Sequence, residues 1–329
     1  MLSLTHKPNH SLSEYIALDL DHTIIKPKSG KTLPKGKDDW TWWNPIVPNK
    51  LQQLAEDNFH ILIITNQSKA KVDEVRDKIL DIFNVLDITI TALICYGDNY
   101  RKPCIKPIQN NHFYPIKWFC GDAVGRPGDF ANTDALFAFN LKIPIITPNE
   151  LFLDDKQTIT IPPPLSIEHN NITLPDNNNQ VILMCGYPAS GKSHFARCQD
   201  KYTIISLDIQ KTKKKVESMY LLNLGKKPII VDNTFPSAES RSWFIQKAKE
   251  ANIQIGCVYC NTHINVAYHL NHYRCEKLPH LKFIPKIVYY VFRKNFQHPS
   301  TEEGLLFVLD YTPNIEEDIF TNYRFPLIE

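Results

Sequence analysis

The eight residues GYPASGKS, at positions 186–193, restrict the folds open to this chain more than any other stretch. They match the pattern G-x-x-x-x-G-K-[ST] and lie between an apolar run, VILMC, and a helical pattern, SHFARCQD. In this strand, loop and helix context, the loop N–H groups bind phosphate at the start of the helix. The sequence therefore predicts a parallel α/β sheet with a phosphate site at a strand end.

Each part of this loop has an expected role. Its N–H groups would surround phosphate oxygens, the Lys192 ammonium would contact the outer phosphates, and the Ser193 hydroxyl would reach Mg²⁺. An incidental glycine loop is the alternative, which the two flanking elements disfavour. We therefore expect ATP to bind the following residues: Gly186, Tyr187, Pro188, Ala189, Ser190, Gly191, Lys192 and Ser193.

Short apolar runs alternate with helical patterns along the whole chain, which is typical of parallel sheets covered by helices. The pattern fails between about residues 154 and 180, where three consecutive prolines precede an asparagine-rich stretch. A chain of 329 residues is long enough for about two domains. We therefore predict an α/β fold with two parallel-sheet domains, 1–155 and 180–329, joined by a linker at 156–179.

The composition excludes several classes of protein. A formal charge of +2 does not fit a surface that is basic throughout, so contacts with nucleic acid should be local. The eight cysteines lie mostly inside apolar runs, which indicates reduced thiols in an intracellular protein and no disulfide framework. No run reaches the roughly 20 apolar residues of a membrane span, and the N-terminus lacks a signal sequence.

Two acidic residues follow the apolar run that begins at Tyr15. Because strand side chains alternate, Asp19 and Asp21 would face one way and Leu20 the other. Two carboxylates in one site are tolerated when a cation lies between them or when one carries a proton. The pair therefore predicts phosphate chemistry with a metal, and a solvated strand end or a calcium-type loop is the alternative.

Polar residues at three more positions fit the same site. The run HILIIT ends at Thr65, whose hydroxyl could hold a phosphate oxygen, and RKP supplies the cation Lys102. The run IKWFC leads to Asp122. Since the carboxyl ends of parallel strands meet at one edge, we expect these groups to converge there.

These four motifs, in this order, resemble those of the haloacid dehalogenase-like phosphatases. The resemblance implies that Asp19 is a nucleophile that forms an aspartyl phosphate, and that Asp21 is the general acid and base. It further implies Mg²⁺ held by Asp19, Asp122 and the main-chain carbonyl of Asp21. One departure is His22, because glycine is common at that position and an imidazole would lie at the mouth of the site.

The second half carries further candidate residues. The run YTIISL is followed by Asp208, which we expect beside the phosphate-binding strand as the general base for an acceptor hydroxyl. Arg274, in the helical stretch AYHLNHYR, could close over the transferred phosphoryl group. Asp232, Asn233 and Arg241 could position the acceptor or its metal, although a helix cap at Ser237 explains part of that pattern.

Zinc is an alternative for the spacing C-x-x-C at Cys257 and Cys260, which several histidines follow. Both cysteines belong to the apolar run IQIGCVYC, which favours a buried strand. We expect no zinc.

Nearly the whole chain is similar to the polynucleotide kinase 3′-phosphatases. The segments that carry this resemblance are DLDHTIIKPKSGKTLP, ITNQ, RKP, GDAVGR, GYPASGKS, DNT, HLNHYR and FRKNFQHPSTEEG. Members of that family remove 3′-phosphates and phosphorylate 5′-hydroxyl ends with ATP, which prepares breaks for ligation. About 14 residues precede Tyr15, too few for the forkhead-associated domain of animal members. We therefore expect no such domain here.

Two segments have uncertain roles. The lysines after Asp208, at 211, 213, 214 and 215, could contact the acceptor strand or could solvate a helix face. Three tryptophans lie in DDWTWWNP, and we expect at least two to be buried, because three exposed indoles would favour aggregation.

Two competing interpretations remain. A small nucleoside or sugar phosphate as substrate would require a cap over the first site, yet the 41 residues between Thr23 and Thr65 leave little room for one. A binding protein with decayed sites is disfavoured by the intact acidic and basic residues. We expect a monomer that binds DNA or RNA ends and ATP, contacts no membrane, and acts inside the cell, in the nucleus or at sites of DNA repair.

Overall fold

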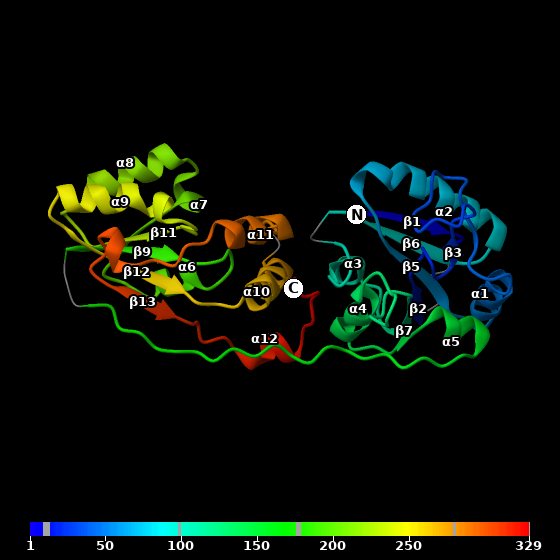
Figure 1. Ribbon diagram of the computed structural model, residues 1–329. Helices are drawn as coiled ribbons and strands as arrows, with labels where there is room; N and C mark the ends of the chain where they lie inside the picture. Colours follow the sequence, from blue (N-terminus) through cyan, green and yellow to red (C-terminus); the bar gives the residue numbers. More distant parts are fainter. Residues whose placement is uncertain (9–13, 98–99, 176–178, 279–280, 329) are drawn as a thin grey trace. The chain divides into compact units, whose positions relative to one another are not determined.

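The computed structural model describes residues 1–8, 14–97, 100–175, 179–278 and 281–328. The chain divides into two compact units (Figure 1). Unit 1 comprises Met1–Pro164, Cys275–Lys282 and Thr321–Pro326, and unit 2 comprises Leu165–Arg274, Phe283–Phe320 and Leu327–Glu329. The functional boundaries predicted at residues 155 and 180 stay predictions.

Unit 1 contains a six-stranded sheet with the order β1-β6-β5-β2-β7-β8. The strands β2, β5, β6, β7 and β8 are parallel, and β1 pairs antiparallel with β6 at the edge. The strands span Leu2–His6 (β1), Tyr15–Leu18 (β2), His60–Asn66 (β5), Ile90–Cys95 (β6), Ile116–Cys120 (β7) and Ile145–Ile146 (β8). The strand β1 precedes the apolar run that begins at Tyr15 and was not predicted from the sequence.

Alternation along the strands of unit 1 divides its core into two layers. Ile16 and Leu18 pack in one apolar cluster with Val75 of α2, whereas Ala17 packs in a second cluster with Phe137 of α4. Burial on both faces explains why these strands are apolar at nearly every position. The helices span Val47–Glu56 (α1), Val72–Leu86 (α2), Lys106–Asn111 (α3), Thr133–Leu141 (α4) and Pro148–Leu153 (α5).

A small hairpin follows β2 in unit 1. Its strands β3 (Ile25–Lys26) and β4 (Thr41–Trp42) pair antiparallel and enclose a long loop. Three tryptophans near β4, Trp40, Trp42 and Trp43, are partly buried and pack against the core. The rings of Trp40 and Trp42 meet edge to face with centroids 5.4 Å apart. They therefore anchor the end of the hairpin loop to the core.

Unit 2 contains a five-stranded parallel sheet with the order β10-β11-β9-β12-β13. The strands span Gln180–Cys185 (β9), Thr203–Ser206 (β10), Ile229–Asp232 (β11), Gln254–Cys260 (β12) and Val308–Tyr311 (β13). The expectation that the strand before Asp208 lies beside the phosphate-binding strand β9 was wrong. The crossover from β9 leads to the sheet edge, and β11 occupies the place between β9 and β10.

Helices cover both faces of the second sheet. Val216 of α8 and Phe244 of α9 pack in one apolar cluster, and Phe195 of α6 packs in another. The helices span Lys192–Arg197 (α6), Leu207–Gln210 (α7), Lys213–Asn223 (α8), Ala238–Glu250 (α9), Ile264–Lys277 (α10), Lys286–Asn295 (α11) and Glu317–Thr321 (α12). Within the described residues, no helix combines the length and apolar character that crossing a bilayer requires.

Candidate active sites

The first site lies at the carboxyl end of β2, where Asp19 begins a tight loop. The Asp19 N–H donates to the Cys120 carbonyl at 2.8 Å, which continues the ladder toward β7. The buried side chain of Leu20 points into the core, and the N–H groups of Ile24 and Ile25 both donate to its carbonyl at 3.0 Å. Burial is the main cause that raises the pKa of Asp19, and the nearby charge of Asp21 adds a smaller contribution in the same direction.

Lys102 is the cationic centre of this site. Its Nζ lies 2.7 Å from Asp19 Oδ1 and 2.7 Å from Asp134 Oδ1, and its side chain is 2 % exposed. Burial alone would lower the pKa of Lys102, but the carboxylates of Asp134 and Asp19 together raise it above its ordinary value. Asn66, at the end of β5, holds the Lys102 backbone by accepting its N–H at 2.7 Å and donating to its carbonyl at 3.1 Å.

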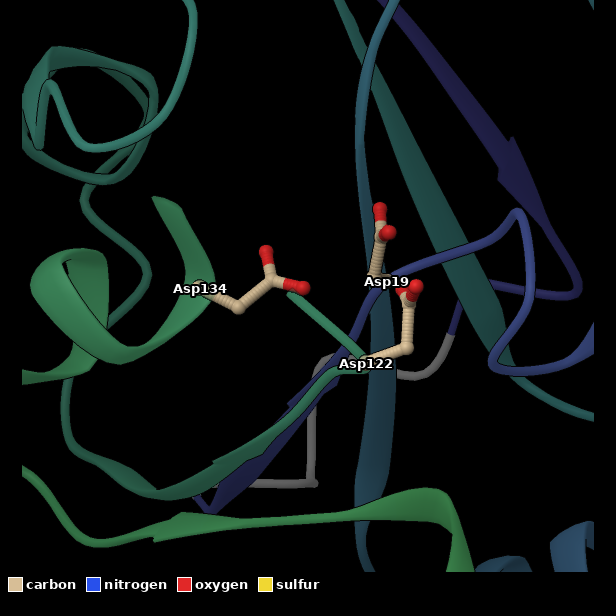
Figure 2. Close-up of side chains that lie close together, drawn as sticks. All are labelled: Asp19, Asp122 and Asp134. Carbon is tan, nitrogen blue, oxygen red and sulfur yellow. The ribbon is translucent and has the colours of Figure 1, made fainter. Parts of the chain in front are cut away.

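Three carboxylates, from Asp19, Asp122 and Asp134, form a cluster whose oxygens lie within 4.8 Å of one another. Figure 2 shows Asp134, at the start of α4, turned toward the other two. Burial raises the pKa of each of the three to about 6, although Lys102 opposes the shift. Among the described residues, this is the one acidic cluster with the spacing of a metal site.

The cluster suits a divalent cation. Three carboxylates against one ammonium leave the cluster with a net negative charge, and oxygen ligands of this kind are those that Mg²⁺ prefers. The side chain of Asp21 is outside the cluster, so its predicted contribution through the main-chain carbonyl stays a prediction.

Sequence reasoning missed Asp134. It is fully buried, and its Oδ2 accepts the Ala123 N–H at 3.0 Å. A Cβ on Gly121 would lie 2.3 Å from Asp134 Oδ2, so the close approach of this carboxylate requires glycine at 121. One feature of the sequence could have identified Asp134: it is an acid next to the apolar residues of α4. Burial of a charged side chain costs free energy unless a partner of opposite charge or hydrogen bonds compensate it.

The other predicted residues of this site lie nearby. Gln67 Nε2 donates to Asp21 Oδ2 at 2.7 Å and to Thr65 Oγ1 at 2.9 Å, which joins the acid and the hydroxyl in one network. Thr23 Oγ1 donates to Asp122 Oδ1 at 3.4 Å. The structure therefore brings together Asp19, Asp21, Thr65, Lys102 and Asp122, as predicted from the strand ends.

A loop with several internal hydrogen bonds follows Asp122. Arg126 donates to the Asp122 carbonyl at 3.1 Å, and its Nη2 bonds to Asp129 Oδ1 at 3.0 Å. The Gly125 N–H donates to the Ala131 carbonyl at 3.2 Å, which closes the loop. Its tip presents Phe130, a phenyl ring that is 96 % exposed. The loop that connects the cluster residues Asp122 and Asp134 therefore carries an exposed aromatic side chain.

The second site lies in the loop after β9. Gly186 and Gly191 have φ values of +142° and +100°, and a Cβ on Gly186 would lie 2.8 Å from the Cys260 carbonyl oxygen. Lys192 Nζ donates to the Gly186 carbonyl at 3.0 Å and also contacts the Tyr187 carbonyl, so the lysine lies across the loop. Burial lowers the pKa of Lys192. The loop lies between β9 and α6, which is the strand, loop and helix order that the sequence predicts, and its binding of ATP stays a prediction.

A cavity of about 210 Å³ opens over this loop. One wall is the loop itself with the start of α6, and the other is α10, which contributes Leu270, Tyr273 and Arg274. Arg274 Nη2 donates to Asn271 Oδ1 at 3.1 Å, which directs the guanidinium along the helix. Lys192, Ser193 and Arg274 therefore line one cavity, and closure of Arg274 over a phosphoryl group stays a prediction.

Asp232, whose role the sequence left open, is the acid that contacts the loop. Ser193 Oγ donates to Asp232 Oδ2 at 2.6 Å, and the Gly186 N–H donates to the Thr234 carbonyl at 3.1 Å. Both acceptors lie at the carboxyl end of β11, the strand beside β9. A hydroxyl and a carboxylate in this arrangement can hold Mg²⁺ with a bound nucleotide.

Asp208 lies on an exposed turn, the short helix α7, whose start Ser206 caps by accepting the Ile209 N–H at 3.2 Å. The structure places Asp232, rather than Asp208, against Ser193. The role of Asp208 as general base stays a prediction.

Arg241 is fully buried and bonded on every side. Its Nε and Nη2 donate to the two oxygens of Glu303 at 2.7 and 2.6 Å, and its Nη1 donates to the Phe235 carbonyl at 2.9 Å. A guanidinium so enclosed holds the segment after β11 in place. It is not available to position the hydroxyl that would receive the phosphoryl group. Cys257 and Cys260 are both buried in β12.

Comparison with known proteins finds a family model and relatives whose descriptions all name a polynucleotide phosphatase. Residues 14–152 match the family model described as polynucleotide kinase 3 phosphatase. The chain is 34% identical over 320 residues to a bifunctional polynucleotide phosphatase/kinase of Schizosaccharomyces pombe, covering 88% of this chain and 78% of that one. It is 27% identical over 214 residues to a polynucleotide 3′-phosphatase of Saccharomyces cerevisiae, covering 44% of this chain and 88% of the relative.

Proposed function

This chain belongs to the family of bifunctional polynucleotide phosphatase/kinases, and from that premise we propose which residues carry out each reaction. It is an enzyme that heals nucleic-acid ends by removing 3′-phosphates and phosphorylating 5′-hydroxyls. The observation that supports the assignment is the presence of two separate phosphate sites. One is the acidic cluster with Lys102 in unit 1, and the other is the Lys192 loop in unit 2.

In the phosphatase reaction, we assign Asp19 as the nucleophile. Lys102 bonds to Asp19 Oδ1, which leaves Oδ2 to attack phosphorus. As the P–O bond to the 3′-carbon oxygen breaks, Asp21 gives its proton to that oxygen and the strand leaves with a 3′-hydroxyl. Asp21 then takes a proton from water, whose oxygen attacks the aspartyl phosphate, releases inorganic phosphate and restores Asp19.

The surrounding groups support this sequence of steps. Gln67 orients Asp21 by donating to its Oδ2, which leaves Oδ1 for proton transfer. Thr65 and Lys102 supply a hydroxyl and a charge for the phosphoryl oxygens. Mg²⁺, when held by Asp19, Asp122 and Asp134, would neutralise negative charge on the same oxygens.

In the kinase reaction, we assign the loop from Gly186 to Ser193 to the phosphates of ATP. Asp208 accepts the proton of a 5′-hydroxyl, whose oxygen attacks the γ-phosphorus, and ADP leaves. Lys192 and Arg274 stabilise the charge that develops on the transferred group. Ser193 and Asp232 would hold Mg²⁺, which would neutralise negative charge on the nucleotide phosphates.

The surroundings of the first site favour a polymer end over a small molecule. The loop between the cluster residues Asp122 and Asp134 carries the exposed ring of Phe130, on which a nucleobase can stack. Stacking of this kind contributes about 1–3 kcal/mol per base and tolerates any sequence. We propose that single-stranded 3′-phosphate ends are preferred, and equal hydrolysis rates on recessed and blunt ends would refute this preference.

We further propose that the enzyme acts as a monomer on DNA ends inside the cell, in the nucleus or wherever strand breaks are repaired. The support is its substrate, since 3′-phosphates and 5′-hydroxyls at one break must both be corrected before ligation. RNA ends present the same two groups and are the natural comparison substrate.

One experiment tests the function directly. The protein is incubated with Mg²⁺, γ-labelled ATP and an oligonucleotide that carries a 5′-hydroxyl and a 3′-phosphate. We expect the label to appear at the 5′ end and inorganic phosphate to be released from the 3′ end. Turnover of a nucleoside 3′-monophosphate or a sugar phosphate at a higher kcat/KM than the oligonucleotide would favour the small-molecule alternative.

A further inference from the structure

His22 lies between the catalytic acids and the hairpin in a left-handed conformation, with φ at +58°. Glycine adopts this conformation without cost, whereas other residues are disfavoured by about 1 kcal/mol or more. The His22 N–H is fixed by a hydrogen bond to the Ile25 carbonyl at 2.7 Å. Any advantage of histidine over glycine at this position must therefore come from its side chain.

The imidazole of His22 makes such a contact. Its Nε2 lies 2.9 Å from the carbonyl oxygen of Thr32. Because a carbonyl only accepts, Nε2 must carry the proton and donate. Thr32 is ten positions along the chain and belongs to the hairpin loop, so this bond joins that loop to the acidic turn.

The loop has its own framework around Asp39. Asp39 accepts the Ser29 N–H and hydroxyl at 2.8 Å each and the Lys35 N–H at 2.8 Å. Hydrogen bonds from Lys35 and Ser29 lower the pKa of Asp39 to about 2. The bonds tie both arms of the loop together below its tip, and Thr32 lies at that tip. The bond from His22 thus places a preformed loop rather than an unstructured one.

The same loop is strongly basic. Residues 26–37, named here the basic loop, contain five lysines, all exposed: Lys26, Lys28, Lys31, Lys35 and Lys37. Two acids, Asp38 and Asp39, follow them directly, so the lysines outnumber the acids of this segment by five to two. Like charges this close repel one another in the free protein. A polyanion that passes over the loop would relieve that repulsion and release its own counterions.

We propose that the basic loop binds the phosphates of the strand that ends in the 3′-phosphate, and that His22 holds the loop beside the acidic cluster. The proposal rests on the proposed phosphatase function of that cluster. His22 acts here as a positioning residue, since it contacts the loop and not the reacting atoms. The bond between His22 and Thr32 sets where the strand enters, and the lysines supply the attraction.

Replacement of His22 by glycine gives the sharpest test. His22→Gly relieves the backbone conformation and removes the bond, so we expect the KM for a 3′-phosphorylated oligonucleotide to rise about five- to tenfold. The kcat/KM for p-nitrophenyl phosphate, which carries no strand phosphates for the loop to bind, should change less than twofold. His22→Gln, which keeps an N–H donor, should restore part of the oligonucleotide KM. An unchanged oligonucleotide KM in His22→Gly, or an equal loss on both substrates, would overturn the positioning role.

The lysines are tested through salt. The variant Lys28→Ala, Lys31→Ala, Lys35→Ala should bind the oligonucleotide more weakly, and the slope of log KM against log salt should fall by about 2, at roughly 0.7 per phosphate contact. The triple variant Lys117→Ala, Lys226→Ala, Lys227→Ala is a control with the same change of charge. All three lysines are exposed and lie near the amino ends of strands, Lys117 in β7 and the other two before β11. The slope of this control should match wild type.

Failure of the proposed phosphatase function and failure of the basic-loop proposal give different results. If wild-type protein does not hydrolyse the oligonucleotide, the proposed function is wrong. If wild type is active but the triple lysine variant keeps the wild-type slope, the function stands and the basic loop is a solvated surface.

Discussion

The Lys102 ammonium lies 2.7 Å from Asp19 Oδ1, the carboxylate that we assign as the nucleophile. Burial raises the pKa of Asp19 to about 6, and Lys102 opposes that shift by favouring the ionised form. Because the pair is shielded from water, salt screens it little. A single lysine thereby keeps a buried acid reactive and can stabilise the phosphoryl oxygens.

Removal of this charge should therefore disable the phosphatase. We expect Lys102→Met to lower kcat for 3′-phosphate release by at least about 100-fold, since one stabilising donor is lost and a buried carboxylate gains a proton. The 5′-kinase rate of the same preparation reports folding and should match wild type. Lys117→Met, at an exposed lysine of β7, is the matched control. A residual phosphatase rate within tenfold of wild type would exclude Lys102 from the chemistry.

Asp134 offers a prediction that the sequence alone did not. Asp134→Asn keeps the shape of the side chain and removes one charge from the cluster, so the Mg²⁺ concentration for half-maximal phosphatase activity should rise about tenfold or more. Magnesium titrations of the initial rate measure this. Asp73→Asn, an exposed acid of α2, should leave the titration unchanged. A normal titration for Asp134→Asn would remove Asp134 from the metal site.

Asp232 should matter to the kinase alone. Asp232→Asn weakens the acceptor of the Ser193 hydroxyl and the expected Mg²⁺ site, so 5′-phosphorylation should fall about 100-fold while 3′-phosphate release persists. Transfer of label from ATP to a 5′-hydroxyl oligonucleotide measures the first rate. Asp200→Asn, exposed in the same unit, is the control. Full kinase activity of Asp232→Asn would shift the metal role to another residue.

We expect the free energy of unfolding of unit 1 to fall at acidic pH because of His60. Burial lowers the pKa of His60 from its ordinary value of 6.5, and its Nε2 lies 2.9 Å from Thr91 Oγ1. The unfolded chain therefore takes up a proton first as pH falls. The stability that neutral His60 contributes is present above pH 6.5 and is lost below it.

The variant His60→Phe keeps a ring against Tyr15 and cannot titrate. Urea unfolding followed by tryptophan fluorescence should show a smaller loss of unfolding free energy between pH 7 and pH 5 than in wild type. His112→Asn, at an exposed histidine, should retain the wild-type loss. An identical pH dependence in His60→Phe and wild type would contradict the assignment.

The strand-end residues could be predicted because each follows a recognisable apolar run. Asp19, Thr65 and Asp122 end three parallel strands, and parallel strands place their carboxyl ends at one edge. The Lys192 loop could be predicted for a similar reason, since its flanks fix its geometry. Such inferences need only local sequence and one general property of the fold.

Contacts set by strand order could not be predicted in this way. Asp232 meets Ser193 because β11 lies beside β9, and nothing local in the sequence states which strand takes that place. Asp134 reaches the cluster only through the turn between β7 and α4, twelve residues after Asp122. The strand β1 was missed because LSLTH is short and half polar, as an edge strand can be.

The most direct test of two independent sites compares Asp19→Asn and Lys192→Ala on one oligonucleotide with a 5′-hydroxyl and a 3′-phosphate. We expect Asp19→Asn to lose 3′-phosphate release and keep 5′-phosphorylation, and Lys192→Ala to show the reverse. Loss of both activities in either folded variant would contradict the account.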